Sequence, residues 1–384
     1  MRRKRLHFIE PSKIGRYHIT LIDGYLRALC ANPVIRSRLD LVFHASASTW
    51  AHLSPSLRET IVWRRIPVVD GDTRRLITKS VLEFLMVLRL LVFAPRRDTI
   101  FVSCVLPTTL LMLELANGLL RRPNFFVVVH GEIEGAFEPS VQGIQSYGFW
   151  VLKWLAVRRQ NSTLQVVVIA EFAREGLLKA FPGKFDPVGT HVVPHPIVPV
   201  PVPGPGAEAA GAETLCFIGY KTPFKGFGAF TRASKAHPDI GFRVIGGGVV
   251  EDVRTGETSA LETNDEFMGA VARCAGAMFP YVSGYRLSLS AAALDALATG
   301  THMIATGRPC FLSLQKTFGS GAVTIYRSDE ELDKILRTPD WLALRAAGRQ
   351  QRLEAVEKSG YGLPAVGAAF ARLLSSPIQG SDSR

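Results

Sequence analysis

The sequence predicts an α/β protein built from two Rossmann-like domains, each an open parallel sheet with crossover helices. Short apolar runs rich in β-branched and aromatic residues alternate with longer helical patterns, and a proline-rich segment divides the 384 residues into two such series. Runs of consecutive apolar residues, such as FFVVVH at 125–130, are typical of strands covered by helices on both faces. Both sheets are therefore expected to be parallel.

The strands of the first half are expected at 5–10, 39–45, 99–104, 124–131 and 164–170. At 198–213 repeated proline excludes a helix and favours an extended linker. The pattern restarts with strands at 214–219, 242–248, 275–281 and 302–306, and with helices at about 227–236 and 290–299. The predicted domains are thus 1–197 and 214–376, with a tail at 377–384.

Ligands of such sheets bind beyond the carboxyl ends of the strands, so two domains on one linker are expected to face a shared cleft. The helical stretch from 341 to 374 either covers the second domain or crosses back to the first.

The charge is concentrated in the first half of the chain. Residues 1–195 hold 26 Lys and Arg against 15 Asp and Glu, whereas the remainder holds 19 against 18. This excess predicts an anionic partner such as a phosphate or an anionic membrane face. Nucleic acid is not expected, because aromatic residues are not interleaved with the basic ones.

The cellular location is predicted from the disulfide pattern and the secretion signal that we do not find in the sequence. The five cysteines include no CxxC pair, so neither a disulfide framework nor a zinc site is suggested. The basic start MRRKR is followed by an apolar run that Glu10 and Pro11 interrupt, which excludes a secretion signal. We expect a cytoplasmic protein, with peripheral contact to the inner face of the plasma membrane.

The longest apolar stretch, residues 81–94, has 14 residues and contains Glu83 and Arg89. A membrane span needs about 20 apolar residues, so no spanning helix is expected. We interpret this stretch as an amphipathic helix packed against its domain, and a helix lying in a lipid interface is the alternative.

Two motifs of the second half favour a phosphate ligand. In FIGYKTPFKGFGAF, 217–230, a strand ends at Gly219, a loop carries Lys221 and Lys225, and a helix begins after Gly226. Ammonium groups beside the amides of a helix start suit a diphosphate, although solvated lysines in an ordinary turn would give the same pattern.

The second motif, YRLSLS at 285–290, precedes an Ala/Leu helix that Ser290 can cap. The hydroxyls of Ser288 and Ser290 and the first helical amides then form an anion site. One turn further, Asp295 could accept hydrogen bonds from a ribose; the alternative roles are a simple cap and a solvated carboxylate.

Over 214–306 the order of these parts resembles the donor domain of GT-B glycosyltransferases, in particular the large retaining group (family 4-like) that contains bacterial polysaccharide and lipopolysaccharide enzymes. The resemblance implies that Gly219, Lys225 and Gly226 bind the donor diphosphate, and that Asp295 matches the second of two family glutamates. The chain departs from the family at Tyr220, where arginine is usual, and at Leu287, where the first glutamate is expected. Tyr285, Arg286, Ser288 and Ser290 are similar to a variant of this motif, in which Arg286 would clamp the diphosphate, and Lys221 could compensate for the missing arginine.

In the first half, His130 ends the strand run NFFVVVHG and is followed by Glu132 and Glu134. A similar histidine in the family contacts the donor sugar, and any of the three could act as a general base or orient the substrates. The loop SKIGRYH, 12–18, offers Lys13, Arg16 and His18 to an anionic acceptor. A strand-end histidine bonded to the backbone, and plain surface charge, are the alternatives.

The leading hypothesis is therefore a hexosyl-transferring glycosyltransferase that uses a nucleotide-sugar donor and a glycan or lipid-linked acceptor in bacterial envelope or exopolysaccharide synthesis. No cofactor or metal is expected, because no DxD-type carboxylate pair precedes a strand end and cationic groups can balance the leaving diphosphate. A non-catalytic nucleotide-binding module of the same fold and a nucleotide-sugar epimerase or phosphorylase are the alternatives.

Overall fold

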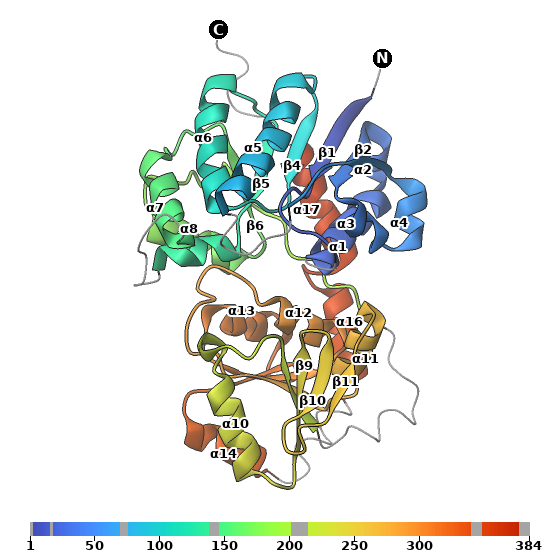
Figure 1. Ribbon diagram of the computed structural model, residues 1–384, viewed down its shortest axis with the longest axis vertical. Helices are drawn as coiled ribbons and strands as arrows, with labels where there is room; N and C mark the ends of the chain where they lie inside the picture. The colour runs from blue at the N-terminus through green and yellow to red at the C-terminus, as the bar shows by residue number, and fades with distance from the viewer. Residues whose placement is uncertain are drawn as a thin grey trace. The chain divides into compact units, whose positions relative to one another are not determined.

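The computed structural model describes residues 3–15, 18–69, 76–137, 146–200, 214–338 and 348–375. Contacts divide the chain into two units: the first runs to Pro196 and regains the chain at Leu363, and the second is Ile197–Gly362. Each unit contains a seven-stranded sheet (Figure 1). Within the described residues, no helix combines the length and apolar character needed to cross a membrane.

The sheet of the first unit is parallel throughout, in the order β3-β2-β1-β4-β5-β6-β7. Its strands are β1 (Lys4–Ile9), β2 (Leu39–Ala45), β3 (Val62–Arg65), β4 (Thr99–Val102), β5 (Phe125–Val128), β6 (Gln165–Val168) and β7 (Thr190–Val192). All residues of β4 and β5 are buried, as their unbroken apolar sequence predicts for strands covered on both faces. The sequence did not predict β3 or β7, which are short.

The helices of this unit are α1 (Ile19–Ala31), α2 (Pro33–Arg38), α3 (Ala47–Ala51), α4 (Pro55–Thr60), α5 (Leu76–Phe93), α6 (Pro107–Leu120), α7 (Tyr147–Val157), α8 (Glu171–Ala180), α17 (Leu363–Ser375) and the 3-10 helix η2 (Gly131–Phe137). In Figure 1, α17 is the red helix that lies among the blue and green elements of the first unit.

Helix α17 packs on α1. The ring of Phe370 lies 5.0 Å from that of Tyr25 and 5.2 Å from that of Phe101, and Phe370 is fully buried. Gly367 allows the two helices to approach closely, because a Cβ there would lie 2.9 Å from the carbonyl oxygen of Ala28. The sequence-based boundary at 376 would leave α17 in the second domain, whereas its contacts place it in the first unit.

The second unit has the strand order β11-β10-β9-β8-β12-β13-β14. Its strands are β8 (Thr214–Ile218), β9 (Gly241–Gly246), β10 (Val249–Asp252), β11 (Thr258–Ala260), β12 (Gly276–Phe279), β13 (His302–Thr306) and β14 (Val323–Tyr326). Strands β10 and β11 pair antiparallel, so this sheet is parallel only in its larger part. Gly247 and Gly248 have φ of 63° and 82°, which makes the tight turn between β9 and β10.

Its helices are α10 (Phe227–Ala236), α11 (Asn264–Ala272), α12 (Ala291–Ala298), α13 (Pro309–Phe318), α14 (Asp329–Leu336), α16 (Arg349–Lys358) and the 3-10 helix η3 (Pro223–Lys225). One core cluster is centred on Phe217, Phe230 and Phe242, which are almost completely buried. The amphipathic α10 contributes Phe230, so the strand-loop-helix pattern of 217–230 is held by its own aromatic side chains.

Both sheets reverse their strand order at one point. In the first unit the chain steps from β1 outward to β2 and β3 and then returns to β4 on the other side of β1. In the second unit β8 is the starting strand and β12 is the return strand. Loops leaving the two strands at such a reversal splay apart, and the crevice between them is where open α/β sheets bind ligands.

Candidate functional site

In the first unit the candidate site begins directly after β1, where Glu10 is fully buried. Its carboxyl accepts hydrogen bonds from the backbone N–H groups of Ser12 and Lys13, at 2.9 and 2.8 Å, and from the hydroxyl of Ser103 at 2.7 Å. Burial raises the pKa of Glu10 to about 7, and these hydrogen bonds oppose the rise. Glu10 thus anchors the loop that carries Lys13 to the end of β4.

Lys13 is the half-buried cation of this site. Burial lowers the pKa of its ammonium, but the surrounding acidic groups, led by Cys104 and Glu132, outweigh burial and hold that pKa above the ordinary value. Lys79, buried in the first turn of α5, belongs to the same cluster, and burial followed by the charge of Lys13 lowers its pKa. Lys13 therefore keeps a positive charge at neutral pH.

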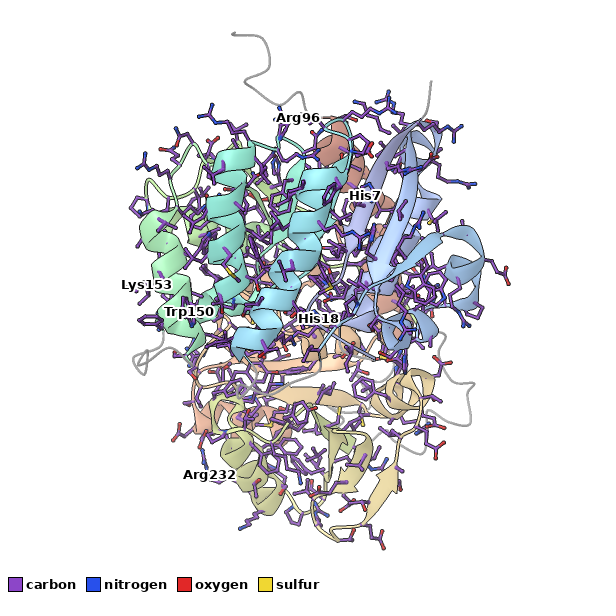
Figure 2. All side chains as sticks on the ribbon, turned by 45° about the horizontal axis from the view of Figure 1, so that its top comes forward. His7, His18, Arg96, Trp150, Lys153 and Arg232 are labelled. Carbon is purple, nitrogen blue, oxygen red and sulfur yellow. The ribbon has the colours of Figure 1, made fainter. Side chains whose placement is uncertain are left out.

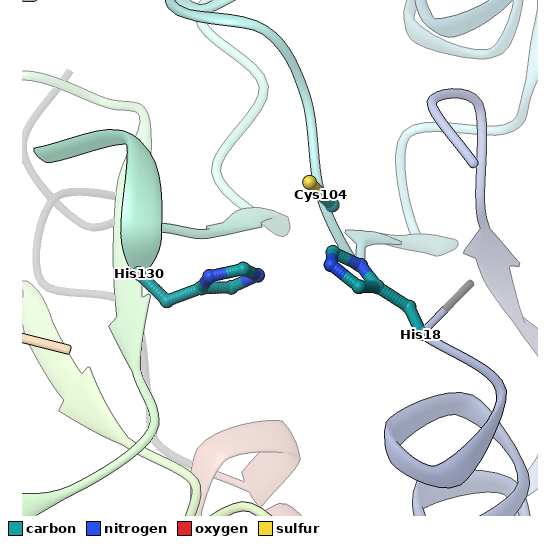
Figure 3. A group of neighbouring side chains, drawn as sticks. All are labelled: His18, Cys104 and His130. Carbon is teal, nitrogen blue, oxygen red and sulfur yellow. The ribbon is translucent and has the colours of Figure 1, made fainter. Parts of the chain in front are cut away.

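His18 and His130 point toward one another, with ring centroids 5.1 Å apart (Figure 3). His18 precedes α1 in a left-handed conformation with φ of 61°, and its Nδ1 has no hydrogen-bond partner among the described residues. Burial, with a smaller contribution from His130, holds the pKa of His18 well below 6.5, so its ring is neutral. The Nδ1 of His130 accepts the N–H of Gly131 at 2.6 Å, so the Nε2 of the ring carries a proton.

Glu132 lies beside this pair on η2. Burial raises the pKa of its carboxyl, but His130 and Lys13 outweigh burial and lower that pKa below the ordinary value, so Glu132 is ionised. Its Oε2 lies 3.7 Å from the Nδ1 of His130, and its Oε1 accepts a hydrogen bond from the thiol of Cys104 at 3.2 Å. Glu134 lies two residues further along η2 and is partly buried.

A metal ion is one ligand to test against this geometry, because the donor atoms of His18, Cys104 and His130 lie within 4.8 Å of one another. Burial, followed by the charge of Glu132, raises the pKa of Cys104 well above 9, so the thiol is protonated, and zinc binds the thiolate. The positive charge of Lys13 also opposes a cation. The cluster is better suited to hydrogen bonding with hydroxyl groups.

In the second unit the candidate site follows β8. Gly219 has φ of 108°, and a Cβ there would lie 2.8 Å from the Nζ of Lys225. Gly226 has φ of 68°, and its Cβ would lie 1.8 Å from the carbonyl oxygen of Pro280, at the end of β12. Glycine at both positions therefore allows the loop to fold onto β12 and brings the ammonium of Lys225 against the end of β8.

Asp295, on α12, interacts electrostatically with Lys225. Burial raises the pKa of Asp295 to about 7, and Lys225 opposes this rise. Burial lowers the pKa of Lys225, and Asp295 opposes that fall. The two half-buried side chains therefore interact electrostatically near the point where the strand order reverses, as expected at a binding site for polar ligands.

Tyr281 connects this pair to the start of α12. The Nζ of Lys225 lies 5.7 Å from the centroid of the Tyr281 ring, and the Tyr281 hydroxyl is hydrogen-bonded to the hydroxyl of Ser290 at 3.0 Å. Ser290 caps α12 by accepting the N–H of Ala293 at 3.4 Å. A lysine ammonium and the positive end of a helix are thus joined through one aromatic side chain.

The remaining predicted residues of the second unit lie around this centre. Tyr285, with φ of 57°, stacks on Tyr281 with ring centroids 4.7 Å apart, and the adjacent Arg286 is exposed. Ser288 is buried just before the cap. Lys221 instead pairs with Glu251 of β10 and lies over the ring of Phe227. Lys221 is therefore engaged with its neighbours, and its compensation for the missing arginine at Tyr220 stays a prediction.

The sequence placed Lys13, His18, His130 and Glu132 together in one unit, and Gly219, Lys225, Gly226, Ser290 and Asp295 together in the other. Arg16 lies outside the described residues. The sequence analysis missed Glu10, Cys104 and Tyr281 as members of these clusters. Each of them comes immediately after a buried strand or within two residues of its end, and that position was the available signal.

Comparisons with known proteins were made in sequence and in structure. No protein-family model and no curated protein sequence matches the chain. Among solved structures, sucrose-phosphate synthase from Thermosynechococcus elongatus is similar at a TM-score of 0.65 and 15% identity, over 97% of this chain and 98% of that one. WaaG, a glycosyltransferase involved in lipopolysaccharide biosynthesis, matches at 0.61 and 12% identity, over 97% and 100%.

HepE of Anabaena, in complex with UDP and glucose, matches at a TM-score of 0.63 and 12% identity, over 98% of this chain and 100% of that chain. These similarities extend over nearly the whole length of both chains in each case, and at identities this low they establish the fold. The chain therefore has the GT-B fold, the two-Rossmann architecture known from glycosyltransferases.

Proposed function

We propose that this protein is a glycosyltransferase of the hexosyl-transferring type, which takes its sugar from a nucleotide-sugar donor bound to the second unit. The observation that carries the proposal is the electrostatic interaction of Lys225 with Asp295 of α12, together with the capped start of that helix. A nucleoside diphosphate needs a cation for its phosphates and an acceptor for its ribose hydroxyls, and these two side chains supply both.

The phosphates interact with the ammonium of Lys225 and with the first N–H groups of α12, whose positive end favours an anion. Arg286, exposed in the loop before α12, adds a second cation at the rim. Asp295, ionised once a bound diphosphate holds Lys225 in its charged state, accepts hydrogen bonds from the ribose. These contacts bind the nucleotide before the sugar is involved.

The acceptor interacts with the first unit. The Nε2–H of His130 is a donor, and the Nδ1 of His18 is without a partner, so a sugar hydroxyl can bind to both rings. Lys13 neutralises an anionic group on the acceptor, and ionised Glu132 is the available base for the attacking hydroxyl. Glu134 belongs to the same proposed site.

No metal is needed in this proposal. The departing nucleoside diphosphate gains negative charge as the glycosidic bond breaks, and preorganised cations and helix amides stabilise that charge without reorganisation. Lys225, Arg286 and the start of α12 provide these groups. The cationic first half of the chain, 26 basic against 15 acidic residues, suits a lipid-linked or anionic glycan acceptor in bacterial envelope or exopolysaccharide synthesis at the cytoplasmic face of the membrane.

Isothermal titration calorimetry with UDP, GDP, ADP and CMP tests the donor site, and UDP is tested first because HepE was solved with UDP and glucose. One nucleotide should bind at a single site. Lys225→Met should weaken that affinity at least about tenfold, since it removes a charge-assisted contact to phosphate. The matched control is Lys235→Met, which removes an exposed lysine of α10 and should leave the affinity unchanged.

Transfer is then measured as release of the bound nucleotide from its hexose conjugates, in the presence of lipid-linked and free oligosaccharide acceptors. Acceptor-dependent release, lost in His130→Ala with donor affinity retained, supports the proposed transferase. Nucleotide binding with no release under any condition would instead identify a binding module, and the absence of nucleotide binding by a folded protein would overturn the proposal.

A further inference from the structure

A groove of about 1000 Å³ lies in the first unit, away from the residues assigned to the acceptor. Its lining comes from β1, β2 and β3, from the α1–α2 region and from one side of α5. None of Lys13, His18, His130 or Glu132 contributes to it. A cavity of this size is large enough for a ligand of several hundred daltons.

The wall formed by α5 is apolar and accessible. Leu82, Leu85, Met86 and Leu90 all line the groove, and their spacing of three or four residues places them on one stripe of the helix. The core side of α5 is a different stripe, with Glu83, Val87 and Leu91 buried. Leu85 remains 51% exposed, and Val62 on the opposite wall is 57% exposed. The groove therefore presents apolar surface to solvent that the core does not use.

The groove is also strongly cationic. Its lining includes six arginines, Arg3, Arg5, Arg36, Arg64, Arg65 and Arg89, and a single acidic residue, Asp40. Asp40 pairs with Arg3 at 4.0 Å. Arg64 and Arg89 form no ion pair with any carboxylate of the described residues. These two guanidinium groups are thus available to an anion.

Arg64 and Arg89 line the same groove as a buried histidine pair. His7 (Figure 2) and His44 are joined through Nδ1 and Nε2 at 3.0 Å, and each is more than nine-tenths buried. Burial, then His7, then Arg64 and Arg89 lower the pKa of His44 to about 4. Both arginines, one on β3 and one on α5, lower the pKa of the same imidazole, and an anion bound in the groove would be attracted to both.

We propose that this groove binds a lipid with an anionic headgroup, with the headgroup on Arg64 and Arg89 and the acyl or alkyl chain along Leu82, Leu85 and Met86. An amphipathic anion is the one ligand class that satisfies both walls at once, because a soluble anion leaves the α5 wall exposed and a neutral lipid leaves the arginines unpaired. The site is independent of the proposed sugar transfer and is tested by binding alone.

The test is calorimetry of the full chain with dodecyl phosphate below its micelle concentration. We expect saturable binding of one molecule per chain. Inorganic phosphate, which lacks the chain, and dodecylphosphocholine, which carries a compensating positive charge, should each bind at least about tenfold more weakly. The double variant Arg64→Gln/Arg89→Gln and the single variant Leu85→Gln should each weaken dodecyl phosphate binding to a similar extent.

Arg159→Gln is the matched control, because Arg159 is an exposed arginine of the same unit outside the groove. It should bind dodecyl phosphate as the unmodified chain does. All substituted side chains are exposed, so far-UV circular dichroism should show every variant folded.

Equal affinity in the Arg64/Arg89 double variant, or inorganic phosphate binding as tightly as dodecyl phosphate, would overturn the proposal. Vesicles distinguish a lipid taken up from solution from a lipid within a bilayer. Sedimentation with phosphatidylglycerol vesicles that depends on Arg64 and Arg89 assigns the headgroup to a bilayer lipid, and dodecyl phosphate binding without such sedimentation assigns a free lipid phosphate. Vesicle binding that neither substitution affects, with no binding of dodecyl phosphate, would also refute the groove as the site.

Discussion

Asp295 of α12 and Lys225, in the loop after β8, interact electrostatically, and each opposes the loss of charge that burial imposes on the other. Burial raises the pKa of Asp295 to about 7 and lowers the pKa of Lys225, and each residue limits the shift of the other. A diphosphate bound to Lys225 would favour the ammonium, which in turn favours the carboxylate of Asp295, so anion binding and ribose recognition are electrostatically linked.

The first prediction concerns stability against pH. The folded-state pKa of Asp295, about 7, lies above its ordinary value of 3.8, so between about pH 4 and 7 the folded protein holds a proton that the unfolded chain releases. The free energy of unfolding contributed by Asp295 therefore falls as the pH rises through this window. Asp295→Asn lacks this titration, and its melting temperature should decline less between pH 5 and 8 than that of the unmodified protein.

Glu10 titrates in the same window, since its pKa is also about 7, but it is present in both proteins and its contribution cancels in the comparison. Melting curves of the two proteins that stay parallel across pH 5 to 8 would contradict the assignment of a raised pKa to Asp295.

The second prediction concerns the glycine at the start of α10. Gly226→Ala introduces a Cβ only 1.8 Å from the Pro280 carbonyl oxygen at a φ of 68°, so it should lower the free energy of unfolding by more than about 2 kcal/mol. Gly228→Ala is the matched control, because Gly228 is helical and a Cβ there meets only the end of the Arg232 side chain at 3.9 Å. That variant should be neutral or slightly more stable, as measured by urea unfolding.

The third prediction separates the hydrogen bonds of Glu10 from its charge. Glu10→Gln keeps an oxygen for the N–H groups of Ser12 and Lys13 and removes the cost of a buried ionisable carboxyl, so it should unfold at a similar urea concentration. Glu10→Ala leaves these donors and the Ser103 hydroxyl without their acceptor, at about 1–3 kcal/mol for each buried group. Equal stability of the two variants would show that Glu10 does not anchor the loop.

Much of the fold follows from the apolar pattern. The strands that the sequence predicts at 39–45, 214–219 and 302–306 appear as β2, β8 and β13, because buried parallel strands are continuous apolar runs. Strands β3 and β10 were missed because their residues are exposed or only partly buried, so their hydrophobic pattern is weak. The sequence could not predict which unit α17 joins, for a different reason. The pattern of an amphipathic helix indicates that one face is buried, but the element that covers this face is set by tertiary contacts such as that of Tyr25 with Phe370.

The candidate site was predictable to a similar degree. Ser290 and Asp295 are brought into one site by the spacing of a single capped helix, which local sequence determines. The pairing of Lys225 with Asp295 joins two different elements, and the sequence indicated both residues without their contact. The ion pair of Lys221 could not be predicted from the sequence, because its partner Glu251 lies on β10, a strand that the hydrophobic pattern did not indicate.

The fourth prediction concerns metal. Purified protein dialysed against EDTA should keep its nucleotide affinity and its transfer rate, because Lys225 and the helix start balance the diphosphate charge and the Cys104 thiol is protonated. Elemental analysis before dialysis should find no stoichiometric zinc. One zinc per chain that disappears in Cys104→Ser would instead assign His18, Cys104 and His130 to a metal site, and loss of transfer restored by Mg²⁺ would place a metal on the donor.

The last prediction follows from α17, which returns to the first unit after the second is complete. Phe370→Ala removes a fully buried ring that contacts Tyr25 and Phe101, and should lower the stability of the first unit by about 3–5 kcal/mol. Arg372→Ala, two residues further along α17 and outside its buried face, is the comparison and should have a small effect. Because the contacts of Phe370 lie within the first unit, nucleotide affinity at Lys225 should persist at temperatures where that unit has melted.

Hydrogen exchange distinguishes the two units. In Phe370→Ala we expect faster exchange of the β1 and β4 amides, with β8 and β12 unchanged. Faster exchange of β8 and β12 alone would place the helix with the second unit.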